Sequence, residues 1–351
     1  MKISATALTA ALLGTVVTVL LVIPMMLQWE RPPMVSEQLG YRGLGMEQVT
    51  NPRIAKTLEA LNQAPVPDDP VDNDGVLVKN DPENYKNVQV LGDLDTAQFN
   101  RLMNSITTWV APQEGDNAGC AYCHNVENMA SDEVYTKVVA RRMIQMTRTI
   151  NTKYASHVQQ TGVTCYTCHR GQPVPANVWS INPGPKQAGG MAASRNGQNL
   201  GGQSVPAYSS LPYDPFTTLF APDAKIRVIA STALPGGTGG TIQATEKTYA
   251  LMMHMSDGLG VNCTFCHNSR IFSNWEESRP QRVTAWHGIK MVSDVNTTYM
   301  DPLAPVFPAN RKGPMGDVLK TNCATCHNGI NKPLYGFSMA KEYPELSVPN
   351  P

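Results

Sequence analysis

The longest uninterrupted apolar stretch lies at the N-terminus, from Ile3 to Gln28, and contains no charged side chain. As a helix at about 1.5 Å per residue, it would exceed the roughly 30 Å hydrocarbon core of a bilayer. A secretory signal peptide is the alternative, but its apolar core is normally shorter and ends at a small-residue cleavage site, which is missing here. We therefore predict an uncleaved transmembrane anchor over 1–30. Lys2 favours a cytoplasmic N-terminus, so the bulk of the chain would be periplasmic.

Beyond the anchor, the apolar pattern is helical only in places. Residues 31–94 are rich in Pro, Asp and Asn and predict an extended segment with little regular structure. A helix is predicted to begin at Asp95, where the Asp-Thr-Ala-Gln sequence resembles a capping box, and to end before Pro112. Its apolar face recurs at helical spacing, at Phe99, Leu102, Met103, Ile106, Trp109 and Val110. Residues 183–240 are rich in Gly, Ser and Pro and predict a connecting segment of loops.

Composition and charge exclude several classes of protein. Among the 351 residues, 28 Lys and Arg balance 28 Asp and Glu, so the basic excess of a nucleic-acid-binding protein is missing. Hydrophobic residues make up 42% of the chain and aromatic residues 7%, which excludes both a disordered chain and a membrane protein with many spans.

The spacing of the cysteines indicates which cofactor the chain binds. All eight fall in four C-x-x-C units, and a histidine follows each unit directly. This pattern is the attachment signature of c-type haem. Two cysteines three positions apart share one face of a helical turn, from which both thiols can add to the haem vinyl groups, and the next histidine can bind the iron. The cysteine pairs are Cys120 and Cys123, Cys165 and Cys168, Cys263 and Cys266, and Cys323 and Cys326; the histidines are His124, His169, His267 and His327.

Three other uses of paired cysteines fit less well. Zinc accepts C-x-x-C pairs but has no need of an adjoining histidine at every one. A thioredoxin-like dithiol needs one such unit rather than four, and disulfide pairing leaves the four histidines unexplained. We therefore predict four covalently bound haem c groups. Haem c is attached outside the cytoplasm, which agrees with the predicted topology.

The chain also contains an internal repeat. An offset of 145 aligns residues 138–154 with 283–299 at seven identical positions. Each half is thus predicted to run helix, motif, helix, motif, with the first two-haem repeat over 95–182 and the second, with the C-terminal tail, over 241–351. The predicted fold is mainly α with extensive loops, in which a pseudo-twofold repeat is arranged around four haems and the haems supply much of the core.

Each iron needs a sixth ligand opposite the motif histidine. Methionine there raises the reduction potential, and a second histidine lowers it. Three helices that precede motifs carry methionine candidates, although ordinary core packing is the simpler explanation for any single methionine. The candidates are Met103, Met143 or Met146, and Met252, Met253 or Met255.

The fourth haem requires a different ligand. In the repeat alignment, Gly288 occupies the position of Met143, so the second half presents no equivalent methionine. Outside the motifs, the chain has three histidines: His157, His254 and His287. His287 is close at hand and His157 lies in the other half, and spacing does not choose between them.

Around these residues the sequence resembles the tetrahaem cytochrome subunit of purple-bacterial photosynthetic reaction centres. The resemblance covers roughly residues 40–345, far more than haem motifs give by chance. One departure concerns the anchor. Some members of that family carry a lipid on an N-terminal cysteine, and this chain has no cysteine before Cys120, so the apolar helix must take that role. The matching segments include 85–92, 138–143, 161–170, 213–216, 262–268, 280–282 and 332–335.

The resemblance implies the ligands and the function. It pairs Met103 with His124, Met143 with His169, Met252 with His267 and His157 with His327, and it places Arg170 and Arg282 beside haems. A cation near a haem disfavours the ferric state and so raises its potential. The implied partners are the L and M subunits that bear the bacteriochlorophyll special pair. The implied donor is a soluble c-type cytochrome or a high-potential iron–sulfur protein, and the implied place is the photosynthetic inner membrane.

Two other functions are compatible with four motifs. A membrane-anchored tetrahaem quinol dehydrogenase also has one N-terminal span, but such proteins are much shorter, and here Cys263 lies 95 positions after Cys168. A multihaem reductase needs an open iron site, whereas each predicted haem has a candidate sixth ligand. We therefore expect an electron-transfer protein without substrate chemistry of its own, rather than an enzyme.

Overall fold

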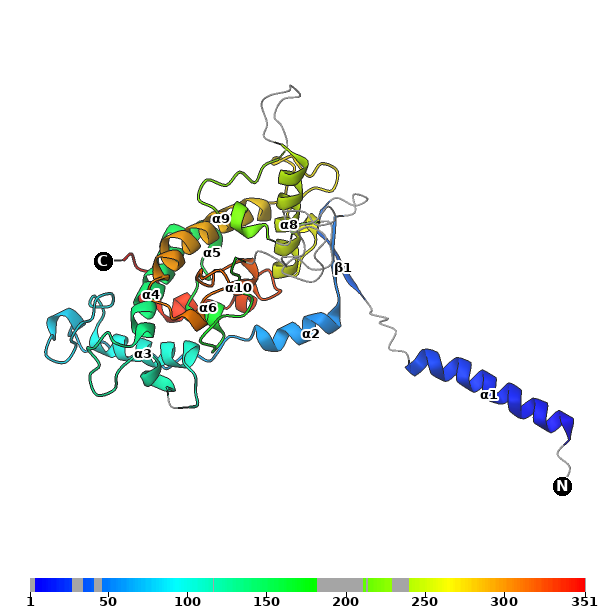
Figure 1. Cartoon of the computed structure of the whole chain (residues 1–351), viewed down its shortest axis with the longest axis horizontal. Helices are drawn as coiled ribbons and strands as arrows, with labels where there is room; N and C mark the ends of the chain where they lie inside the picture. Colours follow the sequence, from blue (N-terminus) through cyan, green and yellow to red (C-terminus); the bar gives the residue numbers. More distant parts are fainter. Residues whose placement is uncertain are drawn as a thin grey trace.

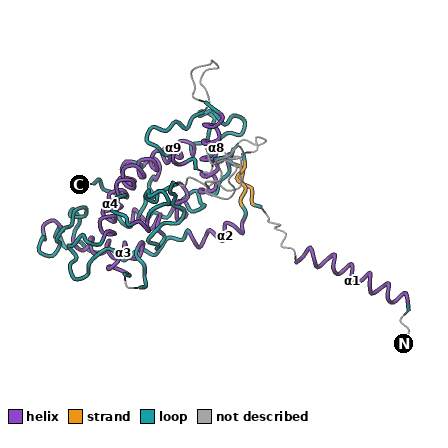
Figure 2. Tube along the Cα trace, viewed as in Figure 1, coloured by secondary structure: helices purple, strands orange, loops and turns teal. Residues whose placement is uncertain are grey.

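The computed structural model describes residues 4–26, 34–40, 46–115, 117–181, 211–212, 214–228 and 240–350. Helices and loops make up nearly all of this part of the chain, and two short strands form a small sheet (Figure 2). The predicted mainly α fold with extensive loops is confirmed. Most of the predicted connecting segment 183–240 lies outside the described residues.

The N-terminal helix stands apart from the helical body (Figure 1). This helix, α1 (Ala5–Met26), has an 18-residue window from Thr9 to Met26 with a mean hydropathy of 2.2, and none of that window is buried. Among the described helices, it is the one long and apolar enough to cross a membrane. A helix of this kind exposes its apolar side chains on all sides, as a lipid environment requires.

The next segment is more regular than the sequence predicts. Strands β1 (Val35–Gln38) and β2 (Glu47–Thr50) pair antiparallel, and helix α2 (Pro52–Leu61) follows at once. The expectation of little regular structure over 31–94 is therefore wrong at its start. Asn51 caps α2 by accepting a hydrogen bond from the backbone N–H of Arg53, and Pro52 suits the first helical position. A short 3₁₀ turn over Val78–Asn80 follows.

The helical body is arranged around four longer helices. These are α3 (Thr96–Val110), α4 (Tyr135–Lys153), α8 (Ile242–Leu259) and α9 (Gln281–Asp294), the last continuing as a π-helical turn over Val295–Met300. Helix α3 has its predicted bounds, and the Asp95 carboxylate caps it by accepting from the N–H of Ala97. The remaining helices are short: α5 (Ala155–Val158), α6 (Cys165–His169), α7 (Phe216–Leu219), α10 (Cys323–His327) and α11 (Met339–Glu342).

The apolar core has two main parts. One packs α3, through Leu102 and Trp109, against the C-terminal tail, where Tyr343 and Leu346 are fully or almost fully buried. The other joins α4, α8 and α9 with Phe216 of α7. The tail that the sequence groups with the second repeat thus packs against the first helix of the first repeat.

Arg148 links helix α4 to two other chain segments. Its side chain has no solvent exposure and pairs with Asp93 at 3.0 Å. It also donates to the carbonyl oxygens of Val90 at 3.2 Å and Glu345 at 3.1 Å. These bonds tie α4 to the loop before α3 and to the C-terminal tail.

We expect Arg148→Met to lower the free energy of unfolding by about 3 kcal/mol, because it removes the buried guanidinium that pairs with Asp93 and leaves two carbonyl oxygens without their donor. Denaturant unfolding of the holoprotein measures this. Arg142→Met is the matched control, since Arg142 also lies on α4 but is only partly buried and stacks over the ring of Tyr299, and it should cost about 1 kcal/mol or less. Equal losses for the two variants would contradict this role.

Candidate haem sites

The second and fourth motifs form single helical turns, as the sequence predicts. Helices α6 and α10 each begin with a reciprocal capping box, made by Thr164 with Thr167 and by Asn322 with Thr325. Each turn places its two cysteines one above the other and its histidine at the end. Both then close through a residue in the left-handed conformation, Arg170 or Asn328.

The first and third motifs have a different local structure. They form the tighter 3₁₀ turns over Gly119–Tyr122 and Cys263–Phe265, so the predicted helical turn is present here too, although not as an α-helix. The histidine is nevertheless fixed in the same way in both. Its backbone N–H donates to the carbonyl oxygen of the first cysteine, at 2.9 Å for His124 and 3.0 Å for His267.

All four motif histidines present the same ring edge. In each, Nδ1 lies at hydrogen-bond distance from a backbone carbonyl oxygen: 3.4 Å for His124, 2.8 Å for His169, 2.8 Å for His267 and 3.0 Å for His327. A carbonyl oxygen only accepts, so Nδ1 carries the proton. The proton-free nitrogen is therefore Nε2, which is the form in which histidine binds a metal.

Burial keeps these imidazoles neutral. It lowers the pKa of His327 to about 4 and holds the pKa of His124, His169 and His267 below the usual value. A neutral ring is available to an iron without first losing a proton. Burial also raises the pKa of the Cys165 thiol to about 12, so this thiol stays protonated before any reaction.

Corresponding asparagines anchor the second motif of each half. The Asn151 side chain donates to the carbonyl oxygen of Val163 at 2.9 Å and accepts from its N–H at 2.7 Å. Asn296 makes the same two bonds with Thr321, at 2.9 and 2.8 Å. Each bonded residue lies two positions before the first cysteine of its motif. These asparagines are identical positions of the repeat, and the sequence alone did not assign them a role.

The second motif opens onto an apolar cavity. Cys165, Cys168 and His169 line it, and Met143 of α4 lines it as well. The expected pair of Met143 and His169 is therefore brought together in one cavity. Met146, the other candidate on α4, lines the same cavity, so the structure keeps both methionines within the site.

The fourth motif has a histidine facing it from the other half. The rings of His157, on α5, and His327 have centroids 6.1 Å apart. Two imidazole nitrogens, each about 2 Å from a shared metal, place the ring centroids about 6 Å apart. Nδ1 of His157 lies 2.9 Å from the carbonyl oxygen of Thr284, which again leaves Nε2 as the metal-binding nitrogen. The residues present thus fit an iron with two histidine ligands.

The other candidate ligands are placed less directly. Met103 packs beside the core that contains Leu102, and Met252 packs beside the core that contains Leu251. Both are half-buried on the helices that precede their motifs. His254 is a buried residue of α8 whose ring lies edge-on to Phe216, and its Nε2 has no hydrogen-bond partner in the part of the chain that the structure describes.

Both predicted arginines lie beside motifs. Arg170 donates to the backbone carbonyl oxygen of Cys326 at 3.2 Å, so the residue that follows the second motif faces the fourth. Its Nε and Nη1 are buried and have no hydrogen-bond partner among the described residues, as donors awaiting an acidic group would be. Arg282 stacks over the ring of Trp275 and is held by carbonyl oxygens of the loop after the third motif. The sequence did not single out Arg311, which lines the cavity of the second motif from a distant 3₁₀ turn.

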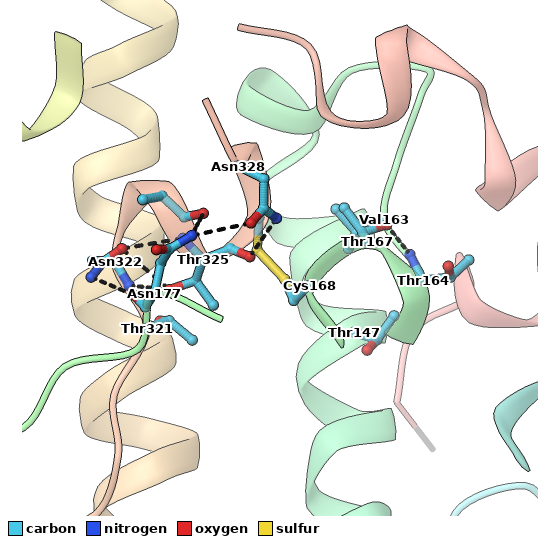
Figure 3. The surroundings of a disulfide bond; sticks show 12 residues. Thr147, Val163, Thr164, Thr167, Cys168, Asn177, Thr321, Asn322, Thr325 and Asn328 are labelled. Carbon is cyan, nitrogen blue, oxygen red and sulfur yellow. Dashed lines mark hydrogen bonds between the residues drawn. A yellow bond between two sulfur atoms is a disulfide. The ribbon is translucent and has the colours of Figure 1, made fainter. Parts of the chain in front are cut away.

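Two expected attachment cysteines are joined to each other. The structure contains a disulfide between Cys168 and Cys326, because α6 and α10 lie back to back with these Cα atoms 4.3 Å apart (Figure 3). This pairing differs from the predicted use of both sulfurs, since a sulfur in a disulfide has no thiol to add to a vinyl group. The other six cysteines are free.

Repeated C-x-x-C-H turns with a metal-ready Nε2 define the class of c-type cytochromes. The chain belongs to the family of photosynthetic reaction centre cytochrome c subunits, whose family model matches residues 30–347. The alternative of a tetrahaem quinol dehydrogenase is not supported by this match.

Similar curated proteins have the same name. The photosynthetic reaction center cytochrome c subunit of Rubrivivax gelatinosus is 49% identical over 318 residues, covering 90% of this chain and 84% of the relative. That of Thermochromatium tepidum is 49% identical over 323 residues, covering 92% and 77%. That of Roseobacter denitrificans is 41% identical over 277 residues, covering 75% and 72%.

Proposed function

We propose that this chain is a tetrahaem electron-transfer subunit. It re-reduces the photo-oxidised special pair held by the L and M subunits, with electrons from a soluble c-type cytochrome or high-potential iron–sulfur protein. The observation that carries the proposal is the shared orientation of His124, His169, His267 and His327, each with Nδ1 bonded to a carbonyl oxygen and Nε2 free. Bound haem iron supplies reversible one-electron transfer.

The protein residues hold and tune the four groups. The eight motif cysteines attach them, the motif histidines bind one side of each iron, and Met103, Met143, Met252 and His157 bind the other. Cys168 and Cys326 each lie in a complete motif. In the haem-loaded protein we therefore expect their sulfurs to form thioether bonds to haem rather than a disulfide with each other. Arg170 and Arg282 offer positive charge beside the haems and favour the reduced state. The matched roles of Asn151 and Asn296 support a pseudo-twofold relation between the two halves.

Contacts between the elements give an order to the four sites. Helix α3 contacts both the first-motif turn and α6, α6 contacts α10, and α10 contacts α8, which leads into the third motif. Electrons would therefore pass from the first site through the second and fourth to the third. The sequence order and the spatial order of the sites differ, because the chain crosses between halves.

The third motif contacts the small two-stranded sheet that follows the N-terminal helix in the sequence. The carbonyl oxygen of Glu47, in β2, accepts hydrogen bonds from the side chains of Asn262 and Thr264. Asn262 directly precedes the third motif, and Thr264 lies within it. Strand β1 begins nine residues after α1 ends, at Val35. With α1 in the inner membrane and the remainder periplasmic, this order delivers electrons toward the membrane and receives them at the first site, at the far end.

Purification of the tagged full-length protein from its native photosynthetic membranes tests the proposal. We expect bacteriochlorophyll to co-purify in constant ratio to haem, because the subunit is bound to the complex that holds the special pair. A control chain with a cleavable signal peptide in place of residues 1–30 should keep its haem and bring less pigment. Haem-loaded full-length protein that repeatedly purifies without pigment under mild detergent would contradict the assignment.

A further inference from the structure

Gly288 lies buried in the middle of α9, where a glycine is unexpected. Glycine within a helix costs about 1 kcal/mol relative to alanine, and a helical backbone does not require it. The reason for a glycine at this position is the ring of His157, which lies directly beside it. A Cβ at position 288 would lie 2.5 Å from Cε1 and 2.8 Å from Nδ1 of His157, closer than packed atoms approach. The imidazole ring occupies the space that any side chain at position 288 would need.

This close approach is what lets His157 cross to the fourth motif. The ring lies against the backbone of α9, and Nδ1 donates to the carbonyl oxygen of Thr284, one turn before Gly288. From there the ring faces His327 at a centroid separation of 6.1 Å. The short helix α5, which carries His157, packs against α9. The ring is therefore fixed from two sides, by a hydrogen bond and by the bare surface of the helix.

The equivalent position in the first half carries a long side chain that lines its own haem site. Repeat alignment places Met143 of α4 opposite Gly288 of α9, and Met143 lines the cavity of its own motif together with His169. One helix position thus offers a side chain to the iron in the first half and leaves room for a histidine from elsewhere in the second.

We propose that residue 288 is the position that determines the sixth ligand of the fourth haem. Because glycine has no side chain, the ring of His157 fits against α9 and can reach the iron. Any side chain at position 288 would occupy that space and keep His157 away from the iron. The inference rests on the proposed ligation of that haem by His157 and His327. Gly288 itself is a positioning residue, because it acts through His157.

The experiment measures carbon monoxide binding to the reduced holoprotein, since only a haem without a sixth ligand binds it readily. Wild-type protein should bind none. Gly288→Ala should displace His157 and give one carbon-monoxide-binding haem per protein, and His157→Ala should do the same. Thr284→Ala is the matched control on α9, because it keeps the carbonyl oxygen that binds His157, and it should behave as wild type.

A double variant tests the choice of ligand directly. His157→Ala with Gly288→Met places a methionine where the first half has Met143. This variant should lose carbon monoxide binding and show more of the absorption signature of methionine-ligated ferric haem than wild type. If Gly288→Ala fails to fold, the double variant tests the proposal in its place. Carbon monoxide binding at the fourth haem of the double variant would overturn the proposal.

The outcomes separate the inference from the function it rests on. If His157→Ala binds no carbon monoxide, His157 is not the ligand and the proposed ligation fails. If His157→Ala binds it while Gly288→Ala binds none and keeps the wild-type spectrum, the ligation stands and the role of Gly288 is refuted.

Discussion

Replacing Cys323 and Cys326 together with serine is expected to yield a protein that carries one covalent haem fewer than wild type. Intact-mass measurement of the purified protein shows this directly, because the wild-type mass should exceed that of the 38.2 kDa chain by four haems. The physical reason is that each motif supplies the two thiols that form thioether bonds, and a histidine alone holds haem only reversibly. Ala324→Ser, inside the same motif, is the matched control and should keep all four.

The disulfide between Cys168 and Cys326 makes this measurement decisive for two motifs at once. If both sulfurs form thioethers, a peptide map of the wild-type holoprotein contains no crosslink between these cysteines, and reduction leaves it unchanged. A retained, reducible crosslink would contradict attachment through both cysteines of the second and fourth motifs. An unaltered haem count in the double serine variant would contradict attachment at the fourth motif altogether.

His157→Met is expected to raise one of the four reduction potentials and leave the other three nearly unchanged. Exchange of a histidine for a methionine ligand favours the reduced iron, and axial ligands span about 0.8 V in haem proteins, so a rise of roughly 0.1 V or more is expected. A redox titration of the membrane complex, followed in the visible spectrum, resolves it. Only one potential should move, because the motif histidine that the ring of His157 faces is His327.

His287→Ala is the matched control for this titration. His287 is the neighbour of Gly288 on α9, and its ring lies edge-on to Trp286. We expect its removal to leave all four potentials close to wild type. An open, ligand-binding haem in His287→Ala, together with unchanged potentials in His157→Met, would show that the ligand comes from within the second half.

The sequence predicts the motifs, the N-terminal helix and α3 well, because each depends on local signals. The apolar run over Ile3–Gln28 contains no proline before Pro24, and Asp95 caps a regular apolar face. The repeat likewise predicts a helix before the second motif of each half, where the structure has α4 and α9. Periodicity and capping are properties of neighbouring residues, so they can be recognised without the fold.

Features that depend on distant contacts cannot be predicted from local patterns and spacing. Spacing left His157 and His287 as equal candidates, because only the packing of α5 on α9 brings His157 to His327. The neighbouring positions of Cys168 and Cys326 depend in the same way on α6 lying against α10. Helix α2 was missed although Asn51 and Pro52 signal its start, since the surrounding composition is that of a loop.

Flash spectroscopy on native membranes tests the central claim most directly. A single flash oxidises the special pair, and absorbance at the special-pair and haem bands is then followed in the same sample. The account predicts that the special pair recovers at the rate at which a haem of this subunit becomes oxidised, and that both the fast recovery and the haem signal are lost when the gene is deleted. Equally fast recovery without any haem oxidation, or in the deletion strain, would contradict it.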